Sequence, residues 1–216
     1  QGKDVGQIMD FVVNLSTGEV RYAMLEFDPG FFKSEKIFAV PLSDLRIEGD
    51  RKALRYTAAS RATIEAAGNE KPDWEKAVDN RRYLSGLDET YGFRPPANTS
   101  RSFRASELIG MKVNVAAGND IGRMKGLMVD LAKGQISFAV LAFDPSWASR
   151  EKLFAFPLTS FRLAKDAEEL TLDVDKSMIA SMKTFDANQW DHLNDLNQKE
   201  SANQPPSAPA NDGLLN

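Results

Sequence analysis

Apolar residues fill nearly every position of two stretches of the chain, Val20–Phe27 and Ile136–Phe143. Both stretches are rich in aromatic and β-branched residues, which favour strands. Each follows a turn that ends in glycine, Ser16-Thr17-Gly18 or Ala132-Lys133-Gly134, and such turns join two strands into a hairpin. A half-buried strand alternates apolar and polar residues, whereas Val20–Phe27 is apolar on both faces. We therefore predict that one face fills a core and that the other is covered by a helix, by a sister domain or by a partner protein.

The two stretches belong to an internal repeat with a constant offset of 116 residues. Between Val5 and Ile47 the first copy shares 16 identities in 43 positions with the second copy, without a gap. The offset also relates Leu54 to Leu170 and Trp74 to Trp190. A repeat of two long units indicates two homologous domains, because a solenoid needs three or more short ones.

Further strands are predicted in both copies. A strand precedes each hairpin turn, a third strand ends at Pro41 or Pro157, and a last strand follows. The predicted ranges are Ile8–Leu15, Lys36–Val40 and Ala53–Thr57 in the first copy, and Met124–Leu131, Lys152–Phe156 and Glu169–Val174 in the second. Short antiparallel strands with glycine turns predict a mainly β fold of two tandem small antiparallel β-barrels, each followed by short α-helices.

Helical patterns follow each copy and set the predicted domains. The helices are expected at Asp73–Leu84, with Trp74 and Val78, at Asp175–Met182, and at Gln189–Gln198, with Trp190, Leu193 and Leu196 on one face. We expect these apolar stripes to pack on their own barrels. The predicted domains are residues 1–84, a linker over 85–104 with breakers such as Pro95 and Pro96, residues 105–198, and a flexible tail over 199–216.

The first copy lacks a counterpart of Ser106–Val115, because Gly2 and Gly6 align with Gly118 and Gly122. A barrel without its first strand exposes an unpaired edge. We expect this edge to be filled by another segment or by another chain.

Composition excludes several classes of site. The chain has 216 residues, a net charge of −4 and a pI near 5.2, which disfavours binding through nucleic-acid phosphates. It contains no cysteine and one histidine, which excludes disulfides, thiolate catalysis and cysteine-bound zinc or iron–sulfur clusters. No apolar run is long enough for a transmembrane helix. We expect neither a cofactor nor a metal site, and the absence of cysteine leaves the compartment open.

The available polar residues do not make a catalytic pattern. His192 lies beside Asp191 on a predicted helix, and no Gly-x-Ser-x-Gly accompanies it, so we interpret it as a surface residue. Asp28-Pro29 and Asp144-Pro145 follow strands, where Asp-Pro starts a turn, and we interpret them as structural. The chain is therefore expected not to be an enzyme.

The segments after each Asp-Pro carry large aromatic residues. Phe31 and Phe32 occur in the first copy and Trp147 in the second. Such residues either plug the end of a barrel or anchor an interface. Arg81, Arg82 and Arg94 belong to the only basic stretch, which is either a solvated loop or a contact surface. These six residues are the predicted partner-binding set.

The sequence resembles the PRC-barrel family. The resemblance rests on Leu108-Ile109-Gly110 with Asp120-Ile121-Gly122, on the strand Gly134–Leu141, and on Lys152–Leu158, with partial counterparts in the first copy. The family takes its name from the H subunit of the photosynthetic reaction centre, and a ribosome maturation factor contains the same barrel. The resemblance implies a small barrel that acts as a docking module without catalytic residues.

Three functions are consistent with these observations. The first is a non-catalytic scaffold or adaptor that docks on a larger complex, such as a membrane complex, through a protein partner. The second is a peripheral H-like subunit of a photosynthetic reaction centre, which rests on family likeness alone. The third is an enzyme or small-ligand binder that uses a cleft between the barrels, which requires convergent polar groups. Neither the identity of the partner nor the oligomeric state follows from the sequence.

Overall fold

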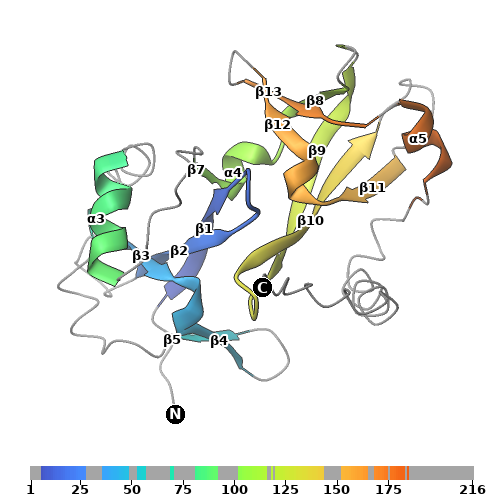
Figure 1. Ribbon diagram of the computed structural model, residues 1–216. Coiled ribbons are helices and arrows are strands. Elements are labelled where there is room, and N and C mark those ends of the chain that lie inside the picture. The colour runs from blue at the N-terminus through green and yellow to red at the C-terminus, as the bar shows by residue number, and fades with distance from the viewer. Residues whose placement is uncertain are drawn as a thin grey trace, which may run out of the picture.

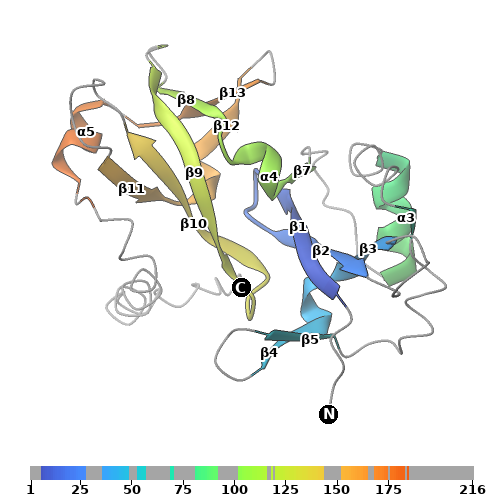
Figure 2. The ribbon, with the colours of Figure 1, turned by 180° about the vertical axis from the view of Figure 1, so that it is seen from behind.

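The structure is a computed structural model that describes residues 6–27, 36–48, 53–56, 69–70, 81–91, 102–115, 118, 120–143, 152–164, 168–174, 176–182 and 184. Most of these residues lie in strands. Two curled sheets lie side by side, one from each copy of the repeat, and the view from behind shows the same arrangement (Figures 1 and 2). The prediction of a mainly β chain is confirmed.

The first repeat contains a five-stranded sheet and a separate two-stranded sheet. The strand order is β6-β3-β2-β1-β7 in the larger sheet, and β4 pairs with β5 in the smaller one. The elements are β1 (Gly6–Asn14), β2 (Val20–Phe27), β3 (Lys36–Pro41), the 3-10 helix η1 (Leu42–Asp44), β4 (Leu45–Glu48), β5 (Ala53–Tyr56), β6 (Asn69–Glu70), α3 (Arg81–Tyr91) and β7 (Ser102–Arg104).

The second repeat forms one six-stranded sheet in the order β11-β10-β9-β8-β13-β12. The elements are α4 (Ala105–Leu108), β8 (Lys112–Val115), β9 (Asp120–Asp130), β10 (Gln135–Phe143), β11 (Lys152–Phe156), the 3-10 helix η2 (Leu158–Ser160), β12 (Phe161–Leu163), β13 (Glu169–Leu172) and α5 (Lys176–Ser181). The described ladders of both repeats form curled, open sheets.

The hairpins β1–β2 and β9–β10 have irregularities at equivalent positions. The pairing of β1 with β2 shifts between Ile8 and Asp10, and the pairing of β9 with β10 shifts at the equivalent residues. Gly6 and Gly122 have φ angles of 152° and 140°. A Cβ at these positions would lie 1.8 Å and 1.9 Å from the carbonyl oxygens of the facing strands. The repeated glycine is therefore required by a close backbone approach as well as by its φ angle.

The described strands of the two repeats differ at one edge of the sheet. In the second repeat β8 pairs with β9 on one side and runs parallel to β13 on the other. No described strand of the first repeat bridges β1 and β5 in this way, so the β4–β5 hairpin forms its own sheet. Part of the expected open edge is filled, because β7 pairs with β1 at Val12–Asn14. β7 therefore pairs with the C-terminal end of β1, whereas β8 pairs with the N-terminal end of β9.

One apolar core extends through both repeats. Its buried members include Val13, Phe27 and Phe38 from the first repeat and Leu141 and Leu170 from the second. Because side chains from both repeats are buried against one another in this cluster, the two repeats form one packed unit.

A second cluster lies on the opposite face of the first sheet. It consists of Val12, Tyr22, Met24, Ile37, Ala39 and Leu84, with Leu87 packed against it. Leu84 and Leu87 belong to α3, which lies on the outer side of the sheet, away from the second repeat (Figure 1). The prediction that both faces of Val20–Phe27 are covered is confirmed, and the cover of the outer face is a helix.

The helix predictions are tested only in part. The helix α3 spans Arg81–Tyr91 and overlaps the predicted helix Asp73–Leu84 at residues 81–84, whereas residues 73–80 lie outside the described residues. Ser102–Arg104, at the end of the predicted linker, is a strand, because β7 pairs with the edge of β1. The predicted helix Asp175–Met182 is present as α5. The prediction for Gln189–Gln198 and the predicted tail lie outside the described residues.

The close approach at Gly122 gives a test of the repeated hairpin. Gly122→Ala should lower the free energy of unfolding by about 2 kcal/mol or more, because the new Cβ meets the Ala142 carbonyl in a strained backbone conformation. Gly86→Ala, at an open helical position in α3, should instead raise it by about 0.5–1 kcal/mol. Urea denaturation of the two variants checks both signs, and equal effects would contradict the assignment.

The different pairing of β5 and β13 predicts a difference in accessibility between equivalent leucines. Leu54 in β5 is 37% exposed, whereas Leu170 in β13 is 0% exposed. The chain has no cysteine, so Leu54→Cys and Leu170→Cys each introduce a single thiol. The thiol at position 54 should react with a maleimide at least about tenfold faster, because a buried thiol reacts only after local opening. Similar rates would show that another segment covers β5.

Candidate functional site

The two repeats meet through their hairpin turns. The Val20 amide donates to the Gly134 carbonyl at 2.9 Å, and the Ile136 amide donates to the Gly18 carbonyl at 2.8 Å. Glu19 and Gln135 form an antiparallel bridge between these two bonds. The bridge joins two equivalent residues, and the two hydrogen bonds exchange under the repeat, because Gly134 and Ile136 are the equivalents of Gly18 and Val20. The seam is therefore a pseudo-twofold contact between two copies of one turn.

Polar side chains shape both turns in the same way. The Asn14 side-chain oxygen accepts hydrogen bonds from the amides of Ser16 and Thr17, at 3.0 Å and 3.2 Å. The Asp130 carboxylate accepts from the amides of Ala132 and Lys133, each at 3.0 Å. Burial alone would raise the pKa of Asp130, but the Lys133 amide and ammonium and the Ala132 amide outweigh it and lower that pKa. These bonds hold the turns in the shape that the seam needs.

The seam determines where the other ends of the strands lie. β2 and β10 both begin at the seam and leave it in opposite directions, because the bridge is antiparallel. Figure 1 accordingly shows the arrowhead of β10 on the far side of the second repeat from β2. Eight or nine residues of strand span roughly 25 Å. Phe27 and Phe143, at the ends of these strands, therefore lie on opposite sides of the molecule.

The predicted aromatic anchors connect to these two ends. Phe27 pairs with Lys36, and Phe143 pairs with Lys152, so the segments 28–35 and 144–151 each leave and re-enter the sheet at one end of a hairpin. Phe31, Phe32 and Trp147 themselves lie outside the described residues. The described residues that precede the two segments, Phe27 and Phe143, lie at opposite ends of the molecule.

The structure describes the backbone of two of the three arginines in the predicted set. Arg81 and Arg82 are the first two residues of α3. Arg94, like His192, Asp28 and Asp144, lies outside the described residues. The prediction that the arginines contact a partner stays a prediction.

Two clefts flank the seam. The larger, of about 440 Å³, is lined by the turn of the second repeat, including Lys133, and by Arg21, Ser43 and Arg46 of the first. The smaller, of about 250 Å³, has Leu15 and Ser16 of the first repeat opposite Thr159 and Arg162 of the second. Ser43 and Arg46 are the equivalents of Thr159 and Arg162, so the clefts are related by the pseudo-twofold axis.

The cations of the larger cleft have structural partners. Arg21 pairs with Asp88, and Lys133 lies 3.2 Å from Asp130. Arg46 donates to the carbonyls of Ser43 and Leu45. These three cations of the cleft therefore bind groups of the protein itself, whereas a ligand site usually has several polar groups that point toward the ligand.

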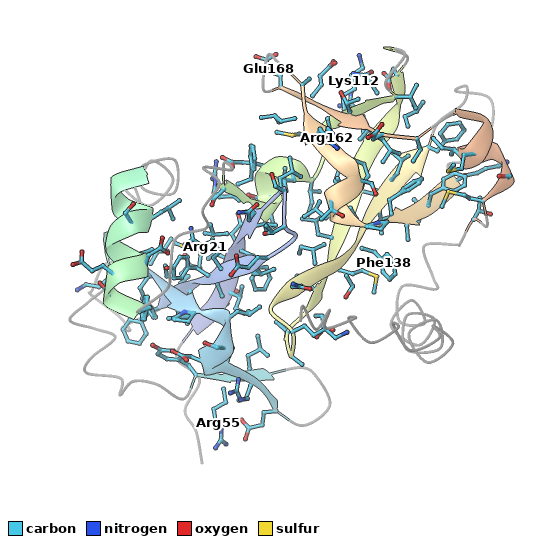
Figure 3. All side chains as sticks on the ribbon, in the orientation of Figure 1. Arg21, Arg55, Lys112, Phe138, Arg162 and Glu168 are labelled. Atoms are coloured by element: carbon cyan, nitrogen blue, oxygen red, sulfur yellow. The ribbon has the colours of Figure 1, made fainter. Side chains whose placement is uncertain are left out.

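A buried ion pair attaches α3 to the first sheet. Arg21 and Asp88 are 7% and 4% exposed, and the Asp88 carboxylate accepts hydrogen bonds from the Arg21 guanidinium and, at 2.6 Å, from the Tyr22 hydroxyl. Burial, and next the hydrogen bond to Asp88, raise the pKa of Tyr22 above its usual value. Tyr91 completes the contact, because its hydroxyl donates to the Ala39 carbonyl at 2.9 Å. Figure 3 shows Arg21 on the first repeat and Phe138, the equivalent of Tyr22, on the other side of the molecule.

A second buried carboxylate joins the repeats. Asp10 is 7% exposed and accepts hydrogen bonds from the Ser106 hydroxyl and, at 3.1 Å, from the Ser106 amide. This bond fixes the start of the second repeat to β1. Asp10, Arg21 and Asp88 are not among the functional residues predicted from the sequence. The signal was a change of polarity between the copies, since the repeat places Gly126 and Ser137 at the positions of Asp10 and Arg21.

The described part of the chain contains neither a cluster of metal ligands nor a helix that could span a membrane. No three histidine, cysteine, aspartate or glutamate side chains come together there as a metal site. In the same residues, no helix has the length and apolar character required to cross a membrane.

The buried pair predicts how α3 responds to mutation. Asp88→Ala should lower the free energy of unfolding by about 3–5 kcal/mol, because the Arg21 guanidinium is left buried without its partner. Glu89→Ala, at the next and exposed position, should change it by less than about 0.5 kcal/mol. Replacing both charges, as Arg21→Leu with Asp88→Leu, should cost less than Asp88→Ala. Denaturant titration measures all three, and a harmless Asp88→Ala would contradict the assignment.

Comparison with known proteins agrees with the repeated architecture. The model of the PRC-barrel domain matches residues 1–59 and 100–179, which together are more than half of the chain. No curated protein matches the chain. The two matched segments coincide with the two repeats that meet at the seam, and the chain belongs to the PRC-barrel family.

Proposed function

We propose that this chain is a non-catalytic adaptor subunit that docks on a larger assembly, such as a membrane complex, through sites at two opposite ends. The observation that carries the proposal is the hairpin seam. It sends β2 and β10 in opposite directions, so Phe27 and Phe143, which precede residues 28–35 and 144–151, lie at the two ends of one packed unit. A body with two separated contact segments is suited to hold two partners, or two parts of one partner, at a set distance.

The proposal includes two closed barrels. Each repeat has the curled hairpin and the third strand in common, and the second repeat adds β8, β13 and β12 to the same sheet. We propose that each repeat completes a small barrel of the family type. The seam would then hold two barrels by their turns, leaving the far ends of the hairpins for contacts.

The contact residues of the proposal are Phe31 and Phe32 at one end and Trp147 at the other. Aromatic side chains at interfaces bury a large area with few rotatable bonds. The two segments differ in sequence, since the repeat places Trp147 and Ala148 opposite Phe31 and Phe32. Different side chains at equivalent ends favour two different partner surfaces. Arg81, Arg82 and Arg94 are proposed as additional contacts with an acidic partner surface.

The use of buried polar groups supports a non-catalytic role. Five polar side chains are buried in the described residues: Asp10, Asn14, Arg21, Glu26 and Asp88. Asp10, Asn14, Arg21 and Asp88 hold turns, strands or helices together, and Glu26 accepts a hydrogen bond from Gln7 at 2.8 Å. A catalytic site usually contains a buried titratable group without such a structural duty.

A second candidate is a small-ligand site in the larger seam cleft. The observation in its favour is a volume of about 440 Å³ lined by both repeats. Its cations are engaged in the pairs described above, so a ligand would have to compete with Asp88 and Asp130 for them. The adaptor is therefore the better supported function.

The adaptor predicts that the two ends bind independently. Phe31→Ala with Phe32→Ala should remove one set of contacts, and Trp147→Ala another, each weakening its own complex by about tenfold or more. Partners cross-linked to the wild type in its native cells are identified by mass spectrometry, and binding of each purified partner is then measured by calorimetry. Met178→Ala, which removes an exposed side chain on α5, is the control.

The result that supports the proposal is loss of one partner with each variant, with unchanged circular dichroism and melting temperature. A triple variant combines Phe31→Ala, Phe32→Ala and Trp147→Ala. If it binds every partner as tightly as the wild type does, the assigned contacts are refuted. Loss of all partners with either variant would show one continuous site and refute the two-ended arrangement.

A further inference from the structure

One edge of the second sheet lies along the smaller cleft. β12 is the terminal strand of that sheet, and among the described strands it pairs only with β13. It lies on the side of the second repeat that faces the first repeat in both views (Figures 1 and 2). Its three consecutive residues, Phe161, Arg162 and Leu163, all line the cleft of about 250 Å³. Neighbouring side chains point to opposite faces of a strand, so a cleft lined by all three runs along the edge.

The ladder shows which backbone groups of β12 point away from this edge. The Ala164 amide donates to the Glu169 carbonyl at 2.8 Å, and the Asp173 amide donates to the Ser160 carbonyl at 3.1 Å. Both pairs continue the register of β12 with β13. Bonded and non-bonded pairs alternate in an antiparallel ladder, so Arg162, midway between the two, is also a bonded position. Its amide and carbonyl therefore point toward β13.

The residues on either side of Arg162 point their backbone groups the other way, toward the cleft. The Phe161 amide donates to the Leu158 carbonyl at the end of η2. No backbone group of the described residues bonds to the Phe161 carbonyl, or to the amide and carbonyl of Leu163, at this edge. One donor and two acceptors in a row are what an added strand pairs with.

In the first repeat a side chain occupies the equivalent edge. Arg46, the counterpart of Arg162, donates to the Leu45 carbonyl at 3.0 Å, and Leu45 is the equivalent of Phe161. Arg162, labelled in Figure 3, instead lies 3.7 Å from Asp173, and both of these side chains are more than half exposed. A cation therefore covers the edge carbonyl in the first repeat and turns away from it in the second.

The cleft and Arg162 set the side chains of an added strand. The residue opposite Arg162 would point outward beside the guanidinium, where a carboxylate makes the favourable cross-strand pair. Its two neighbours would point the other way, toward the apolar lining that Leu15 and Phe103 supply. The cleft holds several times the volume of about 30 Å³ that a water molecule takes in the liquid, so it admits side chains. The exposed pair of Arg162 with Asp173 contributes little and is readily exchanged.

We propose that β12 is a docking edge, which takes an extended segment of a protein partner as an added strand. The segment has an acidic residue between two apolar residues. Its carboxylate pairs with Arg162, and its apolar side chains enter the smaller cleft. The inference goes beyond the adaptor proposal, because that proposal places its contacts at the far ends of the hairpins, whereas this contact lies beside the seam.

Hydrogen exchange of single amides tests the free edge in the full chain. In the free protein the Leu163 amide should exchange at least about tenfold faster than the Arg162 amide, since only the latter is bonded within the ladder. The probe is the blocked peptide Ser-Thr-Val-Glu-Val-Thr-Ser. A saturating amount of it should slow exchange at Leu163 by about tenfold or more and leave Arg162 nearly unchanged, as NMR measures residue by residue.

The added strand is tested by the affinity of the same peptide, labelled with fluorescein, in anisotropy titrations. Leu163→Pro removes the outward amide without removing a ladder bond, so it should weaken binding by about tenfold or more. Leu163→Ala is the matched control, because it shortens the side chain and keeps the amide. It should weaken binding by about threefold at most.

The acidic residue is tested by reversing charges. Arg162→Glu should weaken binding of the peptide by about tenfold or more, and a peptide with lysine in place of glutamate should restore it. Arg46→Glu, at the equivalent position of the first repeat, should leave the affinity unchanged.

Three outcomes would overturn the proposal. Slow exchange of the Leu163 amide in the free chain would show that another segment already pairs with the edge. Absent binding to the wild type, or equal binding of a scrambled peptide, would show that the edge does not select this pattern. Equal loss in Leu163→Pro and Leu163→Ala would show that no backbone bond forms. These variants leave Phe31, Phe32 and Trp147 in place, so failure here is distinguishable from failure of the adaptor proposal.

Discussion

The rest of the structure depends on the antiparallel contact between the two hairpin turns. Two short backbone hydrogen bonds, at 2.8 Å and 2.9 Å, join Gly18 to Ile136 and Val20 to Gly134. Each bond alone contributes only about 1 kcal/mol. Their importance lies in direction, because they fix how the two sheets face one another and allow Val13, Val20 and Ile136 to enter one core. The bonds orient the two sheets, and the burial of the core between them supplies most of the stability.

The two repeats share a hairpin but differ in the elements that pair with it and pack on it. The first repeat attaches α3 by a buried ion pair and receives β7 at the edge of β1, whereas the second contains β8 and joins its last strands to one sheet. The polar substitutions at Asp10 and Arg21 accompany these differences. Asp10 receives the first residues of the second repeat, and Arg21 receives α3. Each repeat therefore keeps the hairpin geometry while its surroundings diverge.

Much of the fold followed from the sequence, because its signals are local. The strands and glycine turns could be predicted from apolar runs, and the same pattern occurs in both copies of the repeat. The end of α3 was not readable, since the helix continues to Tyr91, beyond the predicted end at Leu84, where Asp88 bonds to Arg21 and Tyr91 to the Ala39 carbonyl. The seam was also missed. It is made by backbone atoms, which leave no trace in side-chain patterns.

The candidate site was less predictable than the fold. Phe31, Phe32 and Trp147 were chosen by residue type. The opposite directions in which β2 and β10 leave the seam, which separate Phe27 from Phe143, were not readable from the sequence.

The most direct test of this account is a distance measurement across the molecule. Cysteines at Lys36 and Lys152, which pair with Phe27 and Phe143 at the two far hairpin ends, would carry spin labels in an otherwise cysteine-free chain. The account predicts one narrow distance distribution centred at roughly 35–50 Å, from two strands that diverge from a common seam. A short distance below about 25 Å, or a broad distribution from independently moving repeats, would contradict it.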